Sequence, residues 1–161
     1  MASGRWKRWR GRQAARGCSC SARREISSTS SWRPPGPYTD VDVSVKFKPI
    51  SGREDASGGI IFRFADGRYY VVRANALEDN FRLYANDRGR RQLASASVKP
   101  PALGQWHSLR VVAVGDHMQA WLNGALYLDH RDARFKSGRI GLWTKADSVT
   151  AFDDLVIRGT K

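Results

Sequence analysis

Strict alternation of apolar and polar residues is the feature that most constrains the fold of this chain. In segment 40–49, Val41, Val43, Val45 and Phe47 alternate with polar side chains. Successive side chains of a β-strand point to opposite faces, so this pattern predicts a strand with one buried face. Similar runs are found at residues 59–64, 68–74, 81–84, 91–98, 106–114, 118–122, 125–130, 139–144 and 149–158.

Turn signals separate these runs, among them Asp66-Gly67, Pro100-Pro101 and Asn123-Gly124. Asn-Gly favours a type I′ hairpin turn, because both central positions of that turn need a positive φ. No window of helical length has a clean apolar stripe. Many short strands at regular spacing predict an all-β fold, an antiparallel sandwich or barrel.

The first 37 residues differ in composition from the rest of the 161-residue chain. They hold nine of the 28 Lys and Arg residues but only one of the 15 acidic residues, and they show no apolar periodicity. Such a segment cannot bury enough apolar surface to offset its ordering entropy. We therefore predict a disordered basic tail at 1–37 and a single β-domain at 38–161. Because most of the net charge of +13 lies in the tail, we expect no specific nucleic-acid binding.

Targeting signals are sparse in the sequence. Arg23-Arg24 is similar to a twin-arginine export pair, but no apolar segment follows it, and no apolar run is long enough to cross a bilayer. As it stands, the sequence predicts no transmembrane segment and a cytoplasmic location. Cys18 and Cys20 lack nearby partners for a metal site and are interpreted as inert thiols. The sequence does not define an oligomeric state.

Several long motifs follow one another in the order seen in concanavalin A-like, laminin G-like jelly rolls. They are SGREDASGGIIFRF (51–64), YYVVRANALEDNFRLY (69–84), QWHSLRV (105–111), WLNG (121–124), GLWTKADS (141–148) and AFDDLVI (151–157). Over about residues 37–161 the chain resembles the 3-keto-disaccharide hydrolase domain family, specifically its small, single-domain bacterial members. The resemblance implies a jelly-roll sandwich.

The resemblance also raises a question about the N-terminus. Members of that family usually carry an export signal and one or two strands ahead of the segment that matches Asp40, which implies a periplasmic or extracellular location. Here the basic tail replaces both. We therefore expect a sandwich that lacks one or more N-terminal strands. Residues 1–36 are interpreted as a frameshifted segment or misplaced start, or alternatively as a genuine divergent tail.

Sugar recognition pairs aromatic rings, which cover the apolar face of a pyranose, with planar polar groups that bind its hydroxyls. Alternation should bring Arg63, Tyr69, Arg73, Asn75 and Trp143 together on one concave sheet face. The alternative is that these are ordinary packing or solvated residues. The full set of candidate sugar-binding residues is Arg63, Tyr69, Arg73, Asn75, Arg82, Tyr84, Trp121, Trp143 and Lys145.

Catalysis by a conventional retaining glycosidase is disfavoured, because such enzymes set two carboxylates about 5–5.5 Å apart. On a strand an ExDxxE-like run would supply that pair, and the sequence has none. Beyond the tail, Glu54 and Glu78 are the only glutamates. The family's named chemistry implies instead that a base drives elimination from a 3-keto sugar. Candidates for that base are Glu78, Asp79 and His107, with Arg73 or Lys145 stabilising the enolate.

Metal binding is a further alternative, because several aspartates lie near expected strand ends, where jelly rolls often hold calcium. The chain has no dense Asp/Asn/Gly loop, so no metal and no cofactor is predicted. Three functions remain open. A carbohydrate-binding domain is favoured, a 3-keto-glycoside hydrolase is the first alternative, and a structural or adhesion module is the second.

Overall fold

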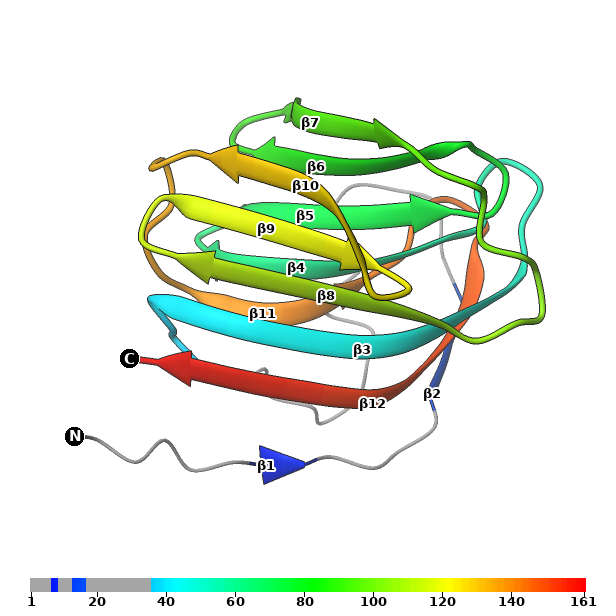
Figure 1. The fold of residues 1–161 in the computed structure, drawn as a ribbon, viewed down its shortest axis with the longest axis horizontal. Coiled ribbons are helices and arrows are strands. Elements are labelled where there is room, and N and C mark those ends of the chain that lie inside the picture. The colour runs from blue at the N-terminus through cyan, green and yellow to red at the C-terminus, as the bar shows by residue number, and fades with distance from the viewer. Residues whose placement is uncertain (1–6, 9–12, 17–35) are drawn as a thin grey trace.

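The structure is a computed structural model that describes residues 7–8, 13–16 and 36–161, and these residues form two antiparallel sheets packed face to face (Figure 1). The five-stranded sheet has the order β11 (Arg139–Trp143), β4 (Ser57–Ala65), β5 (Arg68–Asn75), β6 (Asn80–Asn86) and β7 (Arg90–Ser97). The seven-stranded sheet contains β12 (Val149–Thr160), β3 (Asp40–Ser51), β8 (His107–Val114), β9 (His117–Leu122) and β10 (Ala125–Arg131), with β1 (Lys7–Arg8) and β2 (Gln13–Arg16) on β12. The predicted all-β jelly-roll sandwich is confirmed.

The core lies between the two sheets and comes from the alternation described above. Along β3, Val43 and Phe47 are fully buried while Asp42 and Lys46 are not. From the other sheet, Phe62 is among the residues that close the same core. Removing these apolar faces from water is the main force holding the sheets together. The ten strands predicted between residues 40 and 158 all occur, with ends shifted by a few residues.

The hairpin turns have the geometry that their residues favour. Asn123 has a φ of 51° and Gly124 a φ of 84°, so both central positions are left-handed, as the predicted type I′ turn requires. Asn123 also accepts a hydrogen bond through Oδ1 from the backbone N–H of Ser108. The turn therefore fixes the register of β9 against β10 and ties it to β8.

Two short N-terminal strands pair with β12 along the outer edge of the seven-stranded sheet. Lys7 and Arg8 of β1 pair with Ile157 and Val156, and β2 pairs with the start of β12. The expected loss of N-terminal strands is therefore made up in part by two short segments of the predicted tail. The other residues of segment 1–35 lie outside the described residues, so disorder and a misplaced start remain predictions there.

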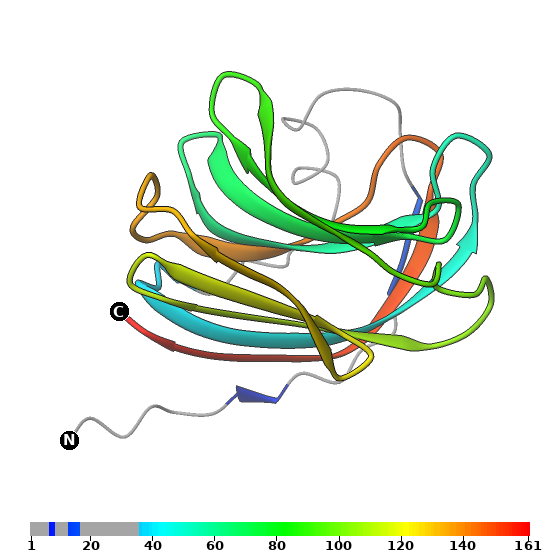
Figure 2. The same cartoon turned by 45° about the horizontal axis from the view of Figure 1, so that its top comes forward.

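Both sheets bend in the same direction, which makes the outer face of the five-stranded sheet concave (Figure 2). This face looks away from the core, and its residues are the alternate positions of β4, β5 and β6. Among the described residues, no helix has the length and apolar character needed to cross a membrane.

Candidate functional site

The outer face of the five-stranded sheet carries an apolar cluster separate from the core. Ile61, Tyr69, Val71, Tyr84 and Trp143 pack together there, with Phe64 against them. Tyr69 and Trp143, predicted as sugar platforms, do lie on this face, but they are only 5% and 6% exposed. Their rings therefore pack mainly within the protein and present little surface for stacking.

Gly59 of β4 leaves room on this face for the Trp143 ring of the neighbouring strand β11. A Cβ atom at Gly59 would lie 2.6 Å from the carbonyl oxygen of Val72 and 3.2 Å from Cε3 of Trp143. Any side chain would displace the Trp143 ring or the strand, so glycine is required by space. Sequence reasoning had not singled out this residue, although a glycine pair inside a strand pattern marks such a close approach.

Arg73 is at the centre of a polar cluster beside these rings. Its side chain projects from the outer face of β5 and the residue is 3% exposed. Its Nη2 donates to Glu78 Oε2 at 2.8 Å and to the Tyr84 hydroxyl at 3.4 Å. We call the set Arg73, Asn75, Glu78, Asn80, Arg82 and Tyr84 the arginine cluster.

Glu78 supplies the negative charge of the cluster from the turn between β5 and β6. Its Oε2 also accepts a hydrogen bond from Asn80 Nδ2 at 2.9 Å, and Arg82 Nη1 lies 3.8 Å away. Burial alone would raise the pKa of Glu78, but the bonds from Arg73 and Asn80 and the nearby guanidinium charges lower it to about 2. A general base works best with a pKa near the working pH. Glu78 is therefore poorly suited to the role of base predicted from sequence.

Tyr84 places its hydroxyl between the two arginines of the cluster. It accepts hydrogen bonds from Arg82 Nη1 at 3.3 Å and from Arg73 Nη2. Burial raises the pKa of the Tyr84 hydroxyl, but the two guanidinium groups outweigh this effect and leave the pKa below its usual range. Arg90 of β7 lies over the same ring, with its guanidinium carbon 4.7 Å from the ring centroid.

Asn75 holds the loop ends beside Arg73. It is fully buried, and its Oδ1 accepts hydrogen bonds from the backbone N–H groups of Ala56 and Leu77. These bonds fix the amide so that its Nδ2 remains without a partner. Part of Asn75's role is therefore structural, as for many asparagines in turns.

Unpartnered polar atoms are concentrated in this cluster. Six buried side-chain nitrogen or oxygen atoms of the described residues have no hydrogen-bond partner, and five belong to the arginine cluster. They are Arg73 Nε, Arg73 Nη1, Asn75 Nδ2, Asn80 Oδ1 and Arg82 Nε. Leaving such a group without a partner costs about 1–3 kcal/mol. These atoms therefore need partners that the described residues do not supply.

Arg63 does not join this site, contrary to the sequence-based expectation. A β-bulge between Phe62 and Ala65 gives Arg63 a φ of 53° and interrupts the alternation that would have sent it to the outer face. The residue is 1% exposed and donates to the carbonyl oxygens of Thr39, Phe135 and Gly115. Arg63 therefore ties together three chain segments at the end of the sandwich.

Two other candidates lie in the opposite sheet. Trp121 of β9 is on the outer face of the seven-stranded sheet, under the guanidinium of Arg110. His107 begins β8, with its ring against Phe47 and its nitrogens within hydrogen-bond distance of Asn123 Nδ2 and the Ala102 carbonyl. The structure therefore does not bring Trp121 or His107 to the arginine cluster.

The remaining candidates lie at the edges of the site. Asp79 is exposed in the same turn as Glu78. Lys145, in the loop after β11, forms an ion pair with Asp55, and its Nζ lies 3.3 Å from Asp55 Oδ2. The two groups are not oriented for a hydrogen bond. Asn80 and Arg90 were not among the candidate sugar-binding residues. Asn80 belongs to the arginine cluster, and Arg90 lies over the Tyr84 ring. Asn80 alternates with Arg82 and Tyr84 along β6, and that pattern could have identified it.

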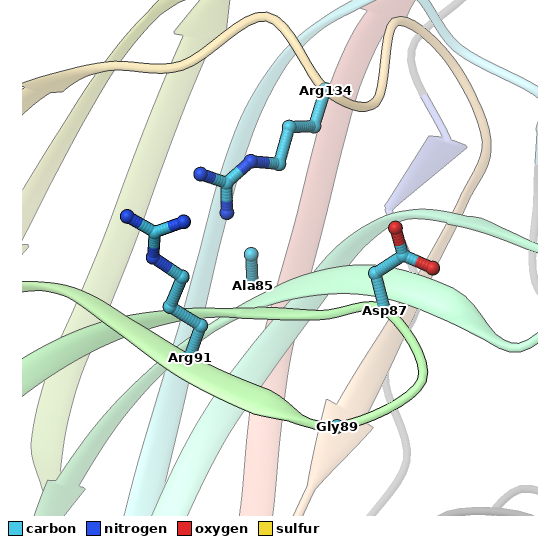
Figure 3. Close-up of a pocket in the computed structure, with 5 residues that line it drawn as sticks. All are labelled: Ala85, Asp87, Gly89, Arg91 and Arg134. Atoms are coloured by element: carbon cyan, nitrogen blue, oxygen red, sulfur yellow. The ribbon is translucent and has the colours of Figure 1, made fainter.

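A hollow of about 230 Å³ lies away from the arginine cluster, between the β6–β7 turn and the loop after β10 (Figure 3). Its lining includes Ala85, Asp87, Gly89, Arg91 and Arg134. Figure 3 shows the guanidinium groups of Arg91 and Arg134 approaching each other across it. Arg134 Nε is also 3.4 Å from Asp132 Oδ2, so its charge is partly compensated.

Two of the aspartates near strand ends, Asp147 and Asp154, have local partners. Asp147 accepts hydrogen bonds from the backbone N–H groups of Arg53, Glu54 and Asp55, which lower its pKa. Asp154 pairs with Lys46 at 2.9 Å. Within the described part of the chain, no group of three or more His, Cys, Asp and Glu residues is arranged to hold a metal ion.

Comparison with known proteins places this sandwich in a family. Residues 6–158 match the 3-keto-alpha-glucoside-1,2-lyase-like domain. The chain belongs to this family. A search of curated proteins found no match. The family match begins well before residue 37, where the sequence motifs had placed the start of the domain.

Solved structures with low sequence identity share the fold. The carbohydrate binding module CBM66 from Bacillus subtilis has a TM-score of 0.71 at 18% identity, over 98% of this chain and 92% of its own. The galectin LEC-6 of Caenorhabditis elegans has 0.55 at 15%, over 76% and 87%. The β-glucanase of Bacillus licheniformis has 0.57 at 13%, over 78% and 68%. These structures share the concanavalin-like β-sandwich fold of this chain.

Proposed function

We propose that this family member is a carbohydrate-binding domain whose ligand is held by the arginine cluster on the concave face of the five-stranded sheet. The observation that carries the proposal is the group of five buried, unpartnered polar atoms in that cluster. A saccharide presents hydroxyl and ring oxygens that match such groups. Arg73 and Asn75 would bind the most buried part of the sugar.

The depth of these groups defines how the sugar would enter. Arg73 and Asn75 are almost completely buried, whereas the side chains of Glu78 and Arg82 are 35% and 32% exposed. A ligand would therefore pass Glu78 and Arg82 and reach inward with one edge. This favours recognition of a terminal or side-chain sugar over stacking of a polysaccharide along a flat aromatic surface.

A glycan array tests the proposal, with the full chain and two matched variants. Arg73→Met removes the guanidinium donors at the centre of the arginine cluster. Arg110→Met is the control. Like Arg73, Arg110 pairs with a carboxylate, that of Asp42, and lies over an aromatic ring, but it is on the opposite sheet. We expect the wild type and Arg110→Met to bind the same glycans and Arg73→Met to lose them. Absence of any glycan binding would favour the structural or adhesion alternative.

Elimination from 3-keto-glycosides is the second candidate, supported by the family to which the chain belongs. In that reaction a base removes the proton next to the keto group, the electron pair forms a carbon–carbon double bond, and the glycosidic oxygen leaves and takes up a proton. Tyr84, with its hydroxyl between two guanidinium groups, is better placed as the base than Glu78. Arg73 and Arg82 would stabilise the negative charge that develops on the keto oxygen.

A turnover assay with a 3-keto-disaccharide separates this candidate from simple binding. If the domain is an enzyme, Tyr84→Phe should retain sugar binding and lose turnover, because the variant keeps the ring and removes only the hydroxyl. If the wild type binds the compound without releasing a monosaccharide, the domain is a binding module.

A further inference from the structure

Two positive charges face each other directly on the concave sheet. Arg73 of β5 and Arg82 of β6 are opposite partners in the strand register, and both donate to the Tyr84 hydroxyl. Like charges directly opposite on neighbouring strands are destabilising. The Glu78 carboxylate contacts both, so one negative charge serves two guanidinium groups.

Arg90 adds a third positive charge at the same place. Its guanidinium lies over the Tyr84 ring, and it forms no ion pair with any other described residue. The groups gathered around Tyr84 therefore carry an excess of positive charge close to a largely buried surface. In such a partly desolvated place, charges interact more strongly than in water.

The unpartnered polar atoms of the arginine cluster are mostly hydrogen-bond donors, which also favours an anionic ligand. Arg73 Nε, Arg73 Nη1, Asn75 Nδ2 and Arg82 Nε are donors, and only Asn80 Oδ1 is an acceptor. A sugar hydroxyl brings a donor with every acceptor, whereas a carboxylate brings acceptors only and a negative charge. Hydrogen bonds between guanidinium and carboxylate are also the stronger kind.

We propose that the sugar bound by the arginine cluster is a carboxylated one, a uronic acid, whose carboxylate lies between Arg73 and Arg82. This inference rests on the proposed carbohydrate-binding function and specifies its ligand class. The carboxylate restores the charge balance that Glu78 achieves only in part. The hydroxyls of the uronic acid then meet Asn75 and Asn80.

The test compares two nearly isosteric ligands by isothermal titration with the full chain. One is an oligogalacturonide or glucuronide, and the other is its neutral methyl ester. We expect the acid to bind about tenfold more tightly or better, because charge-assisted hydrogen bonds are lost in the ester. We also expect the affinity for the acid to fall with added salt while the affinity for the ester does not.

A pair of variants assigns this preference to the cluster. Arg82→Gln, at a partly exposed position, should reduce the preference for the acid over the ester to about threefold or less. Arg110→Gln on the opposite sheet should leave it unchanged. Thermal unfolding of both variants checks that the fold persists.

Three results would overturn the inference. Equal affinities for acid and ester would show that the site takes neutral sugars, which leaves the proposed carbohydrate-binding function intact. A sulfated oligosaccharide that binds as tightly as the uronide would show selection for any anion rather than for a carboxylate. An unchanged preference in Arg82→Gln would place the anion elsewhere. If no saccharide binds at all, the proposed function itself fails together with this inference.

Discussion

Arg73 and Glu78 are joined by an ion pair of 2.8 Å that links the middle of the concave sheet to the turn beside it. The arginine is nearly completely buried, and the glutamate is partly exposed. Removing one partner of such a buried ion pair is strongly destabilising, because it leaves a buried charge without compensation. The pair therefore holds the Arg73 side chain in place, and the low pKa that it gives Glu78 makes this residue a weak candidate for the general base.

Acid stability should report on this ion pair. The pKa of Glu78 falls from its ordinary 4.5 to about 2, so the ionised form stabilises the fold. That contribution is fully present above pH 4.5 and declines as the pH falls toward 2. Because the glutamate is partly exposed and solvent screens it, the effect is modest. Thermal unfolding should show the wild type losing more stability than Glu78→Gln between pH 4.5 and 2.

The control for this measurement is Glu54→Gln, which changes an exposed glutamate of the β3–β4 loop. Its acid profile should follow that of the wild type. Parallel profiles for the wild type and Glu78→Gln would contradict the assigned pair.

Arg63→Met should destabilise the domain without a specific effect on ligand binding. Arg63 is buried and donates to carbonyl oxygens of Thr39, Phe135 and Gly115, which the variant leaves without partners. Chemical denaturation should show a loss of about 3 kcal/mol or more, because several charge-assisted hydrogen bonds disappear together. Arg68→Met, at an exposed position in β5, should change stability by less than about 0.5 kcal/mol. If the Arg63→Met protein is stable but loses sugar binding, Arg63 belongs to the binding site and this account of it is wrong.

Tyr70 should make the domain sensitive to alkali. Burial and a 2.6 Å hydrogen bond to Asp132 Oδ1 raise the pKa of its hydroxyl from 10.0 to about 12, while the bond from the Phe135 N–H acts in the opposite direction. Since the folded pKa is raised, the contribution of Tyr70 is fully present below pH 10 and is lost between pH 10 and 12.

Tyr70→Phe should therefore be less stable at neutral pH and should show a shallower decline above pH 10. Equilibrium unfolding at several alkaline pH values measures this. An equally steep decline in the variant would mean that another group is responsible. Tyr38→Phe, a change to a half-buried tyrosine outside this bond, provides the comparison.

Gly59→Ala should disturb the packing of Trp143. The added methyl group would meet the Val72 carbonyl at 2.6 Å, and overpacking of this kind typically costs about 1–3 kcal/mol. Tryptophan fluorescence and thermal unfolding should both change. Gly89→Ala is a matched control, since nothing lies within 4 Å of its added Cβ. Equal stability of the two variants would contradict the close packing of the Val72 carbonyl and the Trp143 ring around Gly59.

Much of the fold could be predicted because alternation is a local signal. The runs at 40–49 and 118–122 specify which side chains face the core, and the Asn123-Gly124 turn specifies a hairpin. For the site, the same alternation correctly placed Tyr69, Arg73 and Trp143 on one face. It failed at Arg63, because a bulge shifts the register by one position, and no residue pattern identified that bulge.

Other parts of the site depend on contacts that sequence does not contain. The distances among Arg73, Glu78 and Tyr84 decide that Glu78 is a poor base. The assignment of Trp121 and His107 to the opposite sheet depends on strand order, which alternation leaves open. The burial of Tyr69 and Trp143 likewise depends on packing across β4, β5 and β11.

The most direct test of a sugar site at the arginine cluster is a nuclear magnetic resonance titration that follows the arginine Nε–Hε signals. A saccharide identified on the array is added to the full chain, and the signals are assigned with Arg73→Met, Arg82→Gln and Arg110→Met. The account predicts large, saturable shifts of the Arg73 and Arg82 signals, because their Nε atoms have no partner among the described residues. The Arg110 signal, already bonded to Asp42, should remain in place. Saturable shifts at Arg110 with none at Arg73 and Arg82 would contradict the account.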